Sequence, residues 1–359
     1  MPLRSASFTS KYLGIYEYDC GGNILSKTHY PYTTGTPSAG GVTINYTYGN
    51  NDWKDQLTAY NGTVIQYDNI GNPTDDGIWR YTWENGRQLK EMSKGTVGAD
   101  GYMKIEYRYN AEGLRIQKNV TETTASGTTT TTTDYILHGK NIVHLIQGND
   151  KLHFFYDASN KPAIVEFNET RYGYVQNLQG DICQIIDANG AVVVEYTYDA
   201  WGKVLNVTGS MAGTLGKIQP FRYRGYIYDV ETGLYYLRSR YYMPELNRFI
   251  NLDSVFLNNM FSYCSNIPTN QADTDGHAPY DLFDSALEAM IDFADNYGCK
   301  EHEFGTALMR KRDERGQYFY TSPAEGTAYS VSIKSHFPTR EEYVNNEIDC
   351  ISSYSCKSY

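Results

Sequence analysis

The stretch Tyr196-Thr-Tyr198-Asp199-Ala-Trp-Gly202-Lys203 contains the pattern on which the fold depends. Alternating aromatic residues place one face of a β-strand inward, and an aspartate followed shortly by a glycine-containing pair forms a tight hairpin turn. The chain then runs back as the next short strand. A single copy of the pattern therefore predicts a single β-hairpin.

The same pattern recurs along most of the chain. Copies are found at residues 16–23, 66–72, 81–87, 107–113, 155–161, 174–181 and 226–233. Internal repeats of this kind predict an architecture in which each unit packs mainly on its neighbours. The threonine-rich segment Thr121–Thr133 interrupts the series. We interpret it as the extended tip of a long hairpin, because threonine favours strands, with a solvated linker as the alternative.

Composition supports a β-rich, turn-rich chain. The 359 residues include 35 tyrosines and 32 glycines, and only 20% are charged. Tyrosine suits a pleated, half-buried surface and glycine suits turns, so a helical bundle, a coiled coil and a disordered tail are excluded. The net charge of −11 argues against binding of a nucleic-acid backbone as the main role. No apolar run approaches the roughly 20 residues of a membrane span, and the first residues lack the apolar core of a signal peptide.

The densest aromatic segment is residues 220–253, PFRYRGYIYDVETGLYYLRSRYYMPELNRFINLD. Its alternation predicts two strands around the turn Glu231–Gly233. Arginines 222, 224, 238, 240 and 248 interleave with the rings, so we expect guanidinium groups to stack on aromatic side chains. A basic and aromatic segment can also bind nucleic acid. The regular alternation along strands favours the packing interpretation.

These residues carry a family resemblance. The Tyr-Asp and Gly-Asn spacing resembles the YD repeat of RHS (rearrangement hotspot) proteins and their teneurin and insecticidal-toxin relatives. Residues 220–253, continued by 261–277, resemble the RHS-repeat-associated core domain almost residue for residue. The resemblance implies a continuous β-sheet that winds into a hollow shell, a core domain that plugs it, and a variable C-terminal domain packaged inside.

The expected fold class is therefore mainly β. YD-repeat hairpins should form an open, twisted β-sheet wall or partial shell, followed by a small α+β C-terminal domain. We expect a YD-repeat region at residues 1–190, the core or plug at 191–277 and a variable tail at 278–359. The visible repeats are too few to close a full shell.

The first candidate chemistry is self-cleavage, which the resemblance implies for the end of the core. Two carboxylates that share a proton can activate water against a peptide bond. The matching positions are Asp253 and Asp273, and the bond cut would lie near Gly276–His277. Serine and threonine follow these two aspartates where the family has proline, and His277 replaces a leucine. The alternative is that both aspartates cap turns.

The second candidate is the tail. Asp281–Tyr297 has the spacing of an amphipathic helix, residues 303–311 alternate like a strand, and residues 317–321 return from a hairpin turn. This order resembles the opening of the JAB/MPN-like metallopeptidase fold, in which Glu303 would match an acid/base glutamate. His336 stands alone, without the His-x-His that would hold zinc, and the tail looks truncated there. We expect no cofactor, with zinc only if a full-length tail supplies the missing ligands.

Three functions remain open from the sequence. The first is the end of a polymorphic-toxin shell, with its own C-terminal domain as cargo, an incomplete effector tail and a possible immunity protein as partner. The second is an active, self-cleaving toxin that releases a JAB-like hydrolase. The third is an adhesin that binds a cell-surface glycan. All three imply a secreted or cell-surface location as part of a longer chain, with no membrane span, no signal peptide in this chain and no nucleic-acid partner.

Overall fold

The computed structural model describes residues 12–31, 40–253, 259–269, 271–273, 276–277, 304–311, 318–320, 324–325 and 348–356. The chain forms two compact units: residues 1–266 with 274–278, and residues 267–273 with 279–359. The predicted domain boundaries at 190/191 and 277/278 are not tested by this division and stay predictions.

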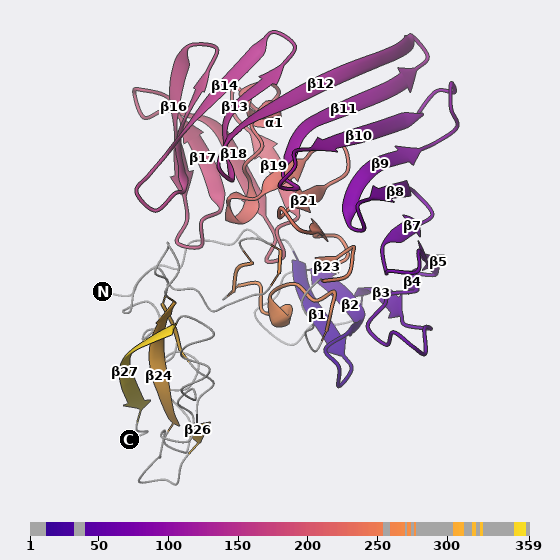
Figure 1. The fold of residues 1–359 in the computed structure, drawn as a ribbon, viewed down its shortest axis with the longest axis vertical. Coiled ribbons are helices and arrows are strands. Elements are labelled where there is room, and N and C mark those ends of the chain that lie inside the picture. Colours follow the sequence, from indigo (N-terminus) through magenta and orange to yellow (C-terminus); the bar gives the residue numbers. More distant parts are fainter. Residues whose placement is uncertain are drawn as a thin grey trace. The chain divides into compact units, whose positions relative to one another are not determined.

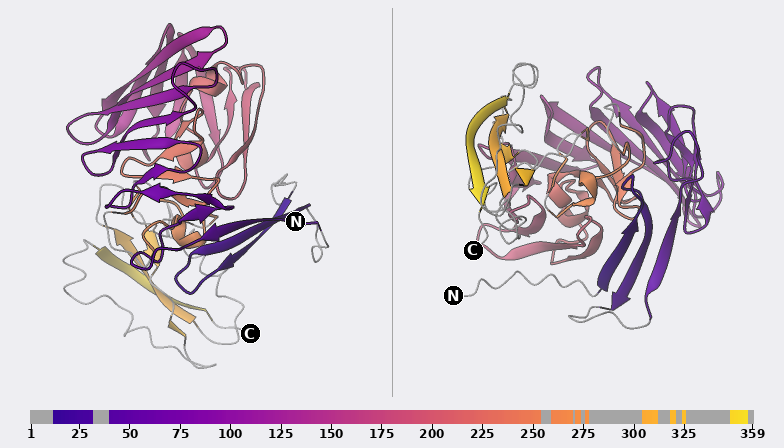
Figure 2. Two further views of the ribbon diagram at one scale, coloured as in Figure 1. Left: turned by 90° about the vertical axis from the view of Figure 1, so that its right-hand side faces the viewer. Right: turned by 90° about the horizontal axis from the view of Figure 1, so that it is seen from below.

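The largest element of the first unit is a sheet of 14 strands in sequence order, each antiparallel to the next, which we call the wall. Its strands are β6 (Gln66–Tyr67), β7 (Pro73–Asp75), β8 (Arg80–Glu84), β9 (Gln88–Lys94), β10 (Met103–Tyr109), β11 (Arg115–Thr124), β12 (Gly127–His138), β13 (Asn141–Gln147), β14 (Asp150–Tyr156), β15 (Pro162–Phe167), β16 (Thr170–Gln176), β17 (Ile182–Ile186), β18 (Val192–Tyr198) and β19 (Val204–Thr208). Figure 1 and Figure 2 show the wall as one open, twisted and curved sheet. The predicted fold class is confirmed.

A second, shorter sheet precedes the wall. It has five strands in sequence order: β1 (Tyr12–Tyr18), β2 (Ile24–Pro31), β3 (Val42–Thr47), β4 (Ala59–Tyr60) and β5 (Thr63–Val64). The first repeat, at residues 16–23, forms the β1–β2 hairpin. Consecutive hairpins thus begin near the start of the described residues and continue to Thr208.

One turn geometry explains the repeats. In the copy at Asp199, the aspartate N–H donates to the Lys203 carbonyl and the Gly202 N–H donates to the aspartate carbonyl. The side-chain Oδ1 of Asp199 accepts two further backbone N–H bonds, from Trp201 and Lys203, each of 2.9 Å. A carboxylate or amide at this position therefore ties up the turn backbone. The same arrangement is present at Asp19, Asp68, Asn110, Asp157, Asn177 and Asp187.

The tyrosine that precedes the turn residue has a second task. The hydroxyl of Tyr198 donates to the Ile182 carbonyl at 2.7 Å, and that of Tyr156 donates to the Ile142 carbonyl at 2.6 Å. Tyr109 makes the equivalent bond with Leu89. Each hydroxyl thus ties its hairpin to an earlier strand of the wall, a role that phenylalanine could not fill.

The threonine-rich segment is a long hairpin, as predicted. β11 and β12 pair from Gln117 with Asp134 to Thr124 with Gly127. Cross-strand threonine hydroxyls bond each other, at 3.0 Å between Thr121 and Thr130. The hairpin is held by paired strands and hydroxyl bonds along its exposed length.

The aromatic core segment forms a compact piece, here called the plug, which lies on the concave side of the wall (orange in Figure 1 and Figure 2). Its elements are α1 (Leu215–Ile218), a 3₁₀ turn (Tyr223–Gly225), β20 (Ile227–Asp229), β21 (Leu234–Tyr236), β22 (Tyr241–Met243), β23 (Arg248–Phe249) and a second 3₁₀ turn (Cys264–Asn266). The predicted strands around Glu231–Gly233 are β20 and β21. The predicted stacking is present too: Arg222 lies 4.2 Å from the Tyr196 ring centroid and Arg240 lies 3.5 Å from that of Phe249.

A single wall turn carries three hydroxyl contacts from the plug. The carbonyls of Ala200, Trp201 and Gly202 accept hydrogen bonds from the hydroxyls of Tyr223 (3.1 Å), Tyr242 (2.7 Å) and Tyr235 (2.8 Å), respectively. Gly202 has φ +85°, and a Cβ there would lie 2.5 Å from the Tyr223 ring. Only glycine allows this close approach.

The second unit contains a small antiparallel sheet. β24 (Phe304–Lys311) pairs with β25 (Tyr318–Tyr320), β26 (Ala324–Glu325) and β27 (Ile348–Cys356). The predicted strand at 303–311 and its return at 317–321 correspond to β24 and β25. The predicted helix Asp281–Tyr297 and the residues Glu303 and His336 lie outside the described residues.

Candidate functional site

The end of the plug brings a buried carboxylate close to the chain segment at which cleavage was predicted. Asp253 is fully buried, and its backbone N–H donates to the Met260 carbonyl at 3.1 Å. Its Oδ1 lies 3.4 Å from Nδ1 of His277, a side chain that is 41% exposed. Asp253 and the predicted cut site are therefore in contact within the first unit.

Arg240 organises this junction. Its guanidinium pairs with Asp253, at 2.8 Å between Nη2 and Oδ2, while Nε donates to the Gly276 carbonyl. The same group donates to the carbonyls of Met260 (3.2 Å) and His277 (3.4 Å). One buried cation thus contacts the carboxylate and the carbonyls on both sides of the Gly276–His277 junction. Such a donor can stabilise negative charge on the Gly276 carbonyl oxygen.

Gly276 fits this position because it has no side chain. Its φ is +82°, and a Cβ would lie 2.5 Å from Ser239 Oγ, 2.9 Å from the Leu237 carbonyl and 3.1 Å from the Arg240 nitrogen. We call the contacts of Arg240 with Asp253 and with the carbonyls of Gly276 and His277 the clamp. Any other residue at position 276 would collide with these neighbours and would have to leave the clamp.

Water can reach the junction from one side. A pocket of about 320 Å³ is lined by His277 and by plug residues that include Arg238, Ser239 and Tyr241. Wall residues such as Tyr109 and Lys140 form its other side. The junction therefore combines a buried carboxylate, a buried cation and a solvent-accessible cavity.

The roles of the other two predicted site residues, Asp273 and Glu303, stay predictions. Asp273 is buried but belongs to the second compact unit, so its pairing with Asp253 stays a prediction. Glu303 lies outside the described residues, and its acid/base role stays a prediction as well. With the side chains as they lie, no group of three or more His, Cys, Asp or Glu among the described residues is placed to hold a metal ion.

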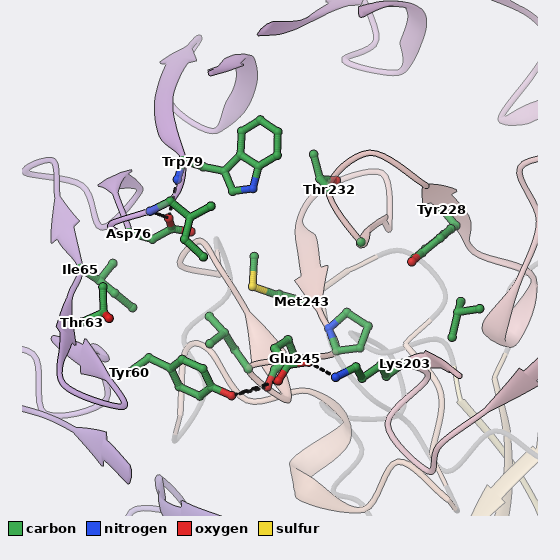
Figure 3. A pocket seen from close by; sticks show the side chains of 15 residues that line it. Tyr60, Thr63, Ile65, Asp76, Trp79, Lys203, Tyr228, Thr232, Met243 and Glu245 are labelled. Carbon is green, nitrogen blue, oxygen red and sulfur yellow. Dashed lines mark hydrogen bonds and ion pairs between the residues drawn. The ribbon is translucent and has the colours of Figure 1, made fainter. Parts of the chain in front are cut away.

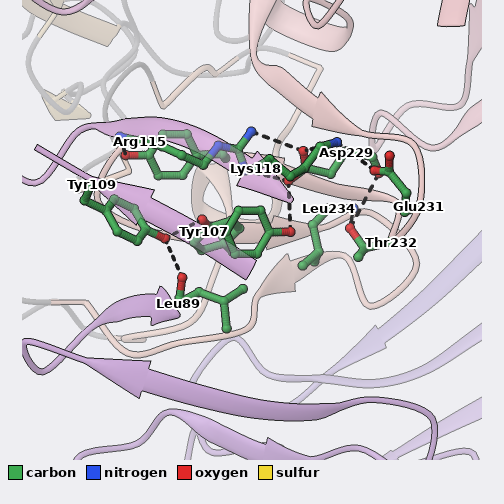
Figure 4. Close-up of polar contacts among 11 residues, drawn as sticks. Leu89, Tyr107, Tyr109, Arg115, Lys118, Asp229, Glu231, Thr232 and Leu234 are labelled. Atoms are coloured by element: carbon green, nitrogen blue, oxygen red, sulfur yellow. Dashed lines mark hydrogen bonds and ion pairs between the residues drawn. The ribbon is translucent and has the colours of Figure 1, made fainter. Parts of the chain in front are cut away.

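A second charged cluster joins wall and plug (Figure 4). Arg115 of β11 contacts Asp229 of β20 through two hydrogen bonds, at 2.6 and 3.1 Å. Lys118 bonds Asp229 at 3.1 Å and Glu231 at 2.7 Å, and Tyr107 donates to Asp229 at 3.3 Å. Arg115 is 1% exposed and Asp229 is fully buried, so their charges are shielded from water.

The ion pair controls the protonation of Asp229. Burial by itself raises the pKa of this carboxyl, but the charges of Arg115 and Lys118 and their hydrogen bonds outweigh burial and hold the pKa below its usual value. At Asp19, Asp68, Asp157, Asp187 and Asp199 the equivalent carboxylate binds its own turn. The Asp229 carboxylate instead bonds Arg115 and Lys118 of the wall, so in this copy it makes long-range contacts in place of turn contacts.

A pocket of about 350 Å³ separates another part of the wall from the plug (Figure 3). Its acidic group Glu245 accepts from the Tyr60 hydroxyl and pairs with Lys203. Asp76 accepts the Trp79 backbone N–H at 2.7 Å. Because these charged groups are engaged, the remaining lining is mainly apolar. The pocket is therefore better suited to bind an apolar group than to catalyse a reaction.

Comparison with known families assigns this wall-and-plug arrangement. Residues 5–273 match the Teneurin YD-shell family. The chain belongs to this family. The predicted YD-repeat recognition is thereby confirmed, and the match covers both the wall and the plug of the YD-shell.

Individual YD-shell relatives agree. The tRNA nuclease WapA of Bacillus subtilis (strain 168) is 35% identical over 233 residues, which is 62% of this chain and 9% of the relative. The toxin subunit YenC1 of Yersinia entomophaga is 24% identical over 300 residues, 77% of this chain and 30% of the subunit. The crystal structure of TcdB2-TccC3-Cdc42 superposes with a TM-score of 0.61 at 20% identity, covering 74% of this chain and 13% of that chain. This chain spans less than a third of the length of each.

Two parts of the site were not predicted from sequence. Arg240 was expected to stack on a ring, and it does, but its contacts with Gly276 and Asp253 depend on the folded path of residues 253–277. Arg115 and Lys118 were not singled out at all. The available signal was a pair of basic residues on a repeat strand, where inward-facing positions are mostly aromatic or aliphatic. Across the described residues, no helix has the length and apolarity needed to span a membrane.

Proposed function

We propose that this chain is the closing end of an RHS-type polymorphic-toxin shell. In this role the wall encloses cargo, the plug seals the wall, and the residues after His277 are the effector domain. The observation that carries the proposal is the clamp at Arg240, which holds the chain where it leaves the plug. The buried Arg240 guanidinium binds two consecutive carbonyls and so fixes the direction in which the chain leaves the plug. A container whose chain continues into a cargo domain requires such a fixed exit.

The relatives support a toxin role. Their printed names describe a tRNA nuclease and a toxin subunit. Because this chain covers 9% of the nuclease, the shared part is a scaffold and the nuclease activity is not transferred to this chain. We propose a secreted or cell-surface location and two partners: the chain's own tail as cargo and an immunity protein. The net charge of −11 supports a shell that does not itself bind nucleic acid.

Limited proteolysis of the purified full chain tests the container role. Chymotrypsin should leave a resistant fragment that ends shortly after residue 277, because aromatic cut sites such as Phe249, Phe261 and Tyr263 are buried. The variant Arg240→Met should open cleavage between residues 253 and 277 while the rest of the fragment persists. Arg171→Met, at an exposed wall position, is the matched control. Equal digestion of the two variants would refute the clamp.

Self-cleavage is the second candidate, and the contact of Asp253 and Arg240 with the predicted cut site favours it. Asp253 would take a proton from a water molecule whose oxygen attacks the Gly276 carbonyl carbon. Arg240 would stabilise the negative oxygen of the tetrahedral intermediate. A protonated Asp273 would donate its proton to the leaving nitrogen of His277 as the C–N bond breaks. The products are a Gly276 carboxylate and a tail that begins at His277.

The mass of the purified chain, followed over time, tests this second candidate. The reaction predicts a fragment beginning at His277 in the parent chain and an intact chain in Asp253→Asn and Asp273→Asn. Asp187→Asn, in an exposed wall turn, is the control and should cleave like the parent. An intact parent would eliminate self-cleavage and leave the container role standing. The JAB-like activity of Glu303 and the glycan-binding adhesin have no further support among the described residues.

A further inference from the structure

The outer face of the wall carries two histidines in direct cross-strand register. His144 of β13 pairs with His153 of β14, and the two strands are neighbours in Figure 1. Their ring centroids are 4.0 Å apart with an interplanar angle of 82°. Directly opposed side chains on one face of an antiparallel pair lie close enough to share a ligand. Both rings are partly exposed, while their neighbours Leu145 and Leu152 point into the core.

A carboxylate continues the same row. Glu166 of β15 is the register partner of His153, and Arg171 of β16 is the partner of Glu166. Glu166 Oε2 accepts from Arg171 Nε at 2.9 Å, in an ion pair whose arginine side chain is 67% exposed. Exposed ion pairs of this kind contribute little free energy, so Glu166 can be released by a better partner.

The surroundings suit a cation that prefers nitrogen ligands. On its other side, His144 pairs with Ile136 of β12. Phe155 lies two residues after His153 on the same face of β14. Of the cations near the histidine pair, Lys151 lies two residues before His153 and Arg171 is the register partner of Glu166. Arg171 is occupied by Glu166 and by the Phe155 ring, 5.2 Å away.

We propose that His144 and His153 form a binding site for a divalent transition-metal ion, with Glu166 as the third ligand after it leaves Arg171. Imidazole nitrogens favour Zn²⁺, Cu²⁺ and Ni²⁺ over the oxygen-preferring Mg²⁺ and Ca²⁺. Two imidazoles, a carboxylate and water complete a four-coordinate zinc shell. The wall would then bind a metal on the face opposite to the plug, independent of the cleavage junction and of the tail.

Calorimetric titration of the metal-free full chain with ZnCl₂, CuCl₂ or NiCl₂ tests the site. We expect one ion per chain, Cu²⁺ tighter than Zn²⁺, and no binding of MgCl₂. His144→Gln and His153→Gln should each weaken binding at least about tenfold, since each removes a ligand from a small set. His138→Gln, at the end of β12, is the control and should bind like the parent. Thermal unfolding in EDTA should give the same midpoint for all four proteins.

Two further variants test the third ligand. Glu166→Gln should weaken Zn²⁺ binding, and Arg171→Gln should strengthen it because the carboxylate is already free. An unchanged dissociation constant in both would overturn the role of Glu166. Undiminished binding in the double variant His144→Gln/His153→Gln, or no binding in the parent, would overturn the whole proposal.

Discussion

The guanidinium of Arg115 in the wall and the carboxylate of Asp229 in the plug form a buried ion pair, 2.6 Å at its shortest, across 114 residues of sequence. The pair joins β11 to the end of β20. Both charges are buried away from water. The wall charge is neutralised by a plug residue, and the plug charge by wall residues. The wall and the plug therefore depend on each other for the neutralisation of their buried charges.

Removal of one partner of this pair should be costly. Asp229→Asn leaves Arg115 buried without a counter-charge, and we expect a loss of about 3–5 kcal/mol in the free energy of unfolding. Urea unfolding, followed by tyrosine fluorescence, measures this. Glu106→Gln, which breaks the more exposed pair with Lys104, should cost at most about 1 kcal/mol. Similar losses in the two variants would contradict the role assigned to Asp229.

The plug hydroxyls that bind the wall turn at 200–202 give a second prediction. Tyr242→Phe and Tyr235→Phe each leave a buried carbonyl without its donor, so each should lower the free energy of unfolding by about 1–3 kcal/mol. Tyr172→Phe is the matched control, since in the part of the wall that the structure describes the Tyr172 hydroxyl has no hydrogen-bond partner. If all three variants unfold at the same urea concentration, the hydroxyls do not hold the plug to the wall.

Lys27 predicts a dependence of stability on pH. Burial lowers its pKa to about 8, against the opposing charge of Glu245. Between pH 8 and its ordinary pKa near 10.5, the unfolded state therefore binds a proton that the native state has lost, and stability rises with pH. From pH 7 to 9.5 the contribution of Lys27, measured as the difference between the parent and Lys27→Met, should grow by about 2 kcal/mol.

Lys27→Met should remove this rise, and urea unfolding at several pH values measures it. Lys90→Met, at an exposed position, should keep the slope of the parent. Ionisation of tyrosines in the unfolded state acts in the opposite direction, already below about pH 10, but equally in the parent and in Lys27→Met, so the two proteins are compared at each pH. A difference between them that stays constant from pH 7 to 9.5 would show that the pKa of Lys27 is not lowered in the folded chain.

Gly276 offers a test of the clamp that does not depend on self-cleavage. In Gly276→Ala the new methyl group collides with Ser239 and the Leu237 carbonyl, so the chain should leave Arg240. Subtilisin should then cut at residues 276–277 at least about tenfold faster, without a shift in the thermal midpoint of the wall. Gly213→Ala, where a Cβ meets nothing within 4 Å, is the control. Equal rates in the two variants would contradict the clamp.

The wall could be predicted from sequence because its information is local. Each Tyr-Asp-turn-Gly unit fixes one hairpin through bonds within about five residues, as at Asp199. The copy at Asp187 was missed because Gln184 and Ile186 stand at the two positions that are aromatic before Asp199. Its turn nevertheless has the same hydrogen bonds. The capping side chain and the glycine therefore identify a repeat more reliably than the aromatic residues do.

The contacts of the plug could not be predicted in the same way. Asp229 has the sequence context of a turn cap, yet its carboxylate bonds to Arg115 and Lys118. Arg240 stacks on Phe249, as alternation indicated, and also reaches Gly276, which no spacing rule connects to it. These contacts form between segments that are distant in sequence and adjacent in the folded chain. A repeat pattern does not predict which distant segments become adjacent.

Hydrogen exchange with mass spectrometry tests most directly the central claim that the plug is locked into the wall. In the parent chain, amides of β11 and of β20–β21 should exchange at the same slow rate, as one cooperative unit. In Asp229→Asn both sets should accelerate together, while β16 and β17 change less. Rapid exchange of β20–β21 in the parent, with β11 still protected, would contradict the account, because it would mean that the plug opens without the wall.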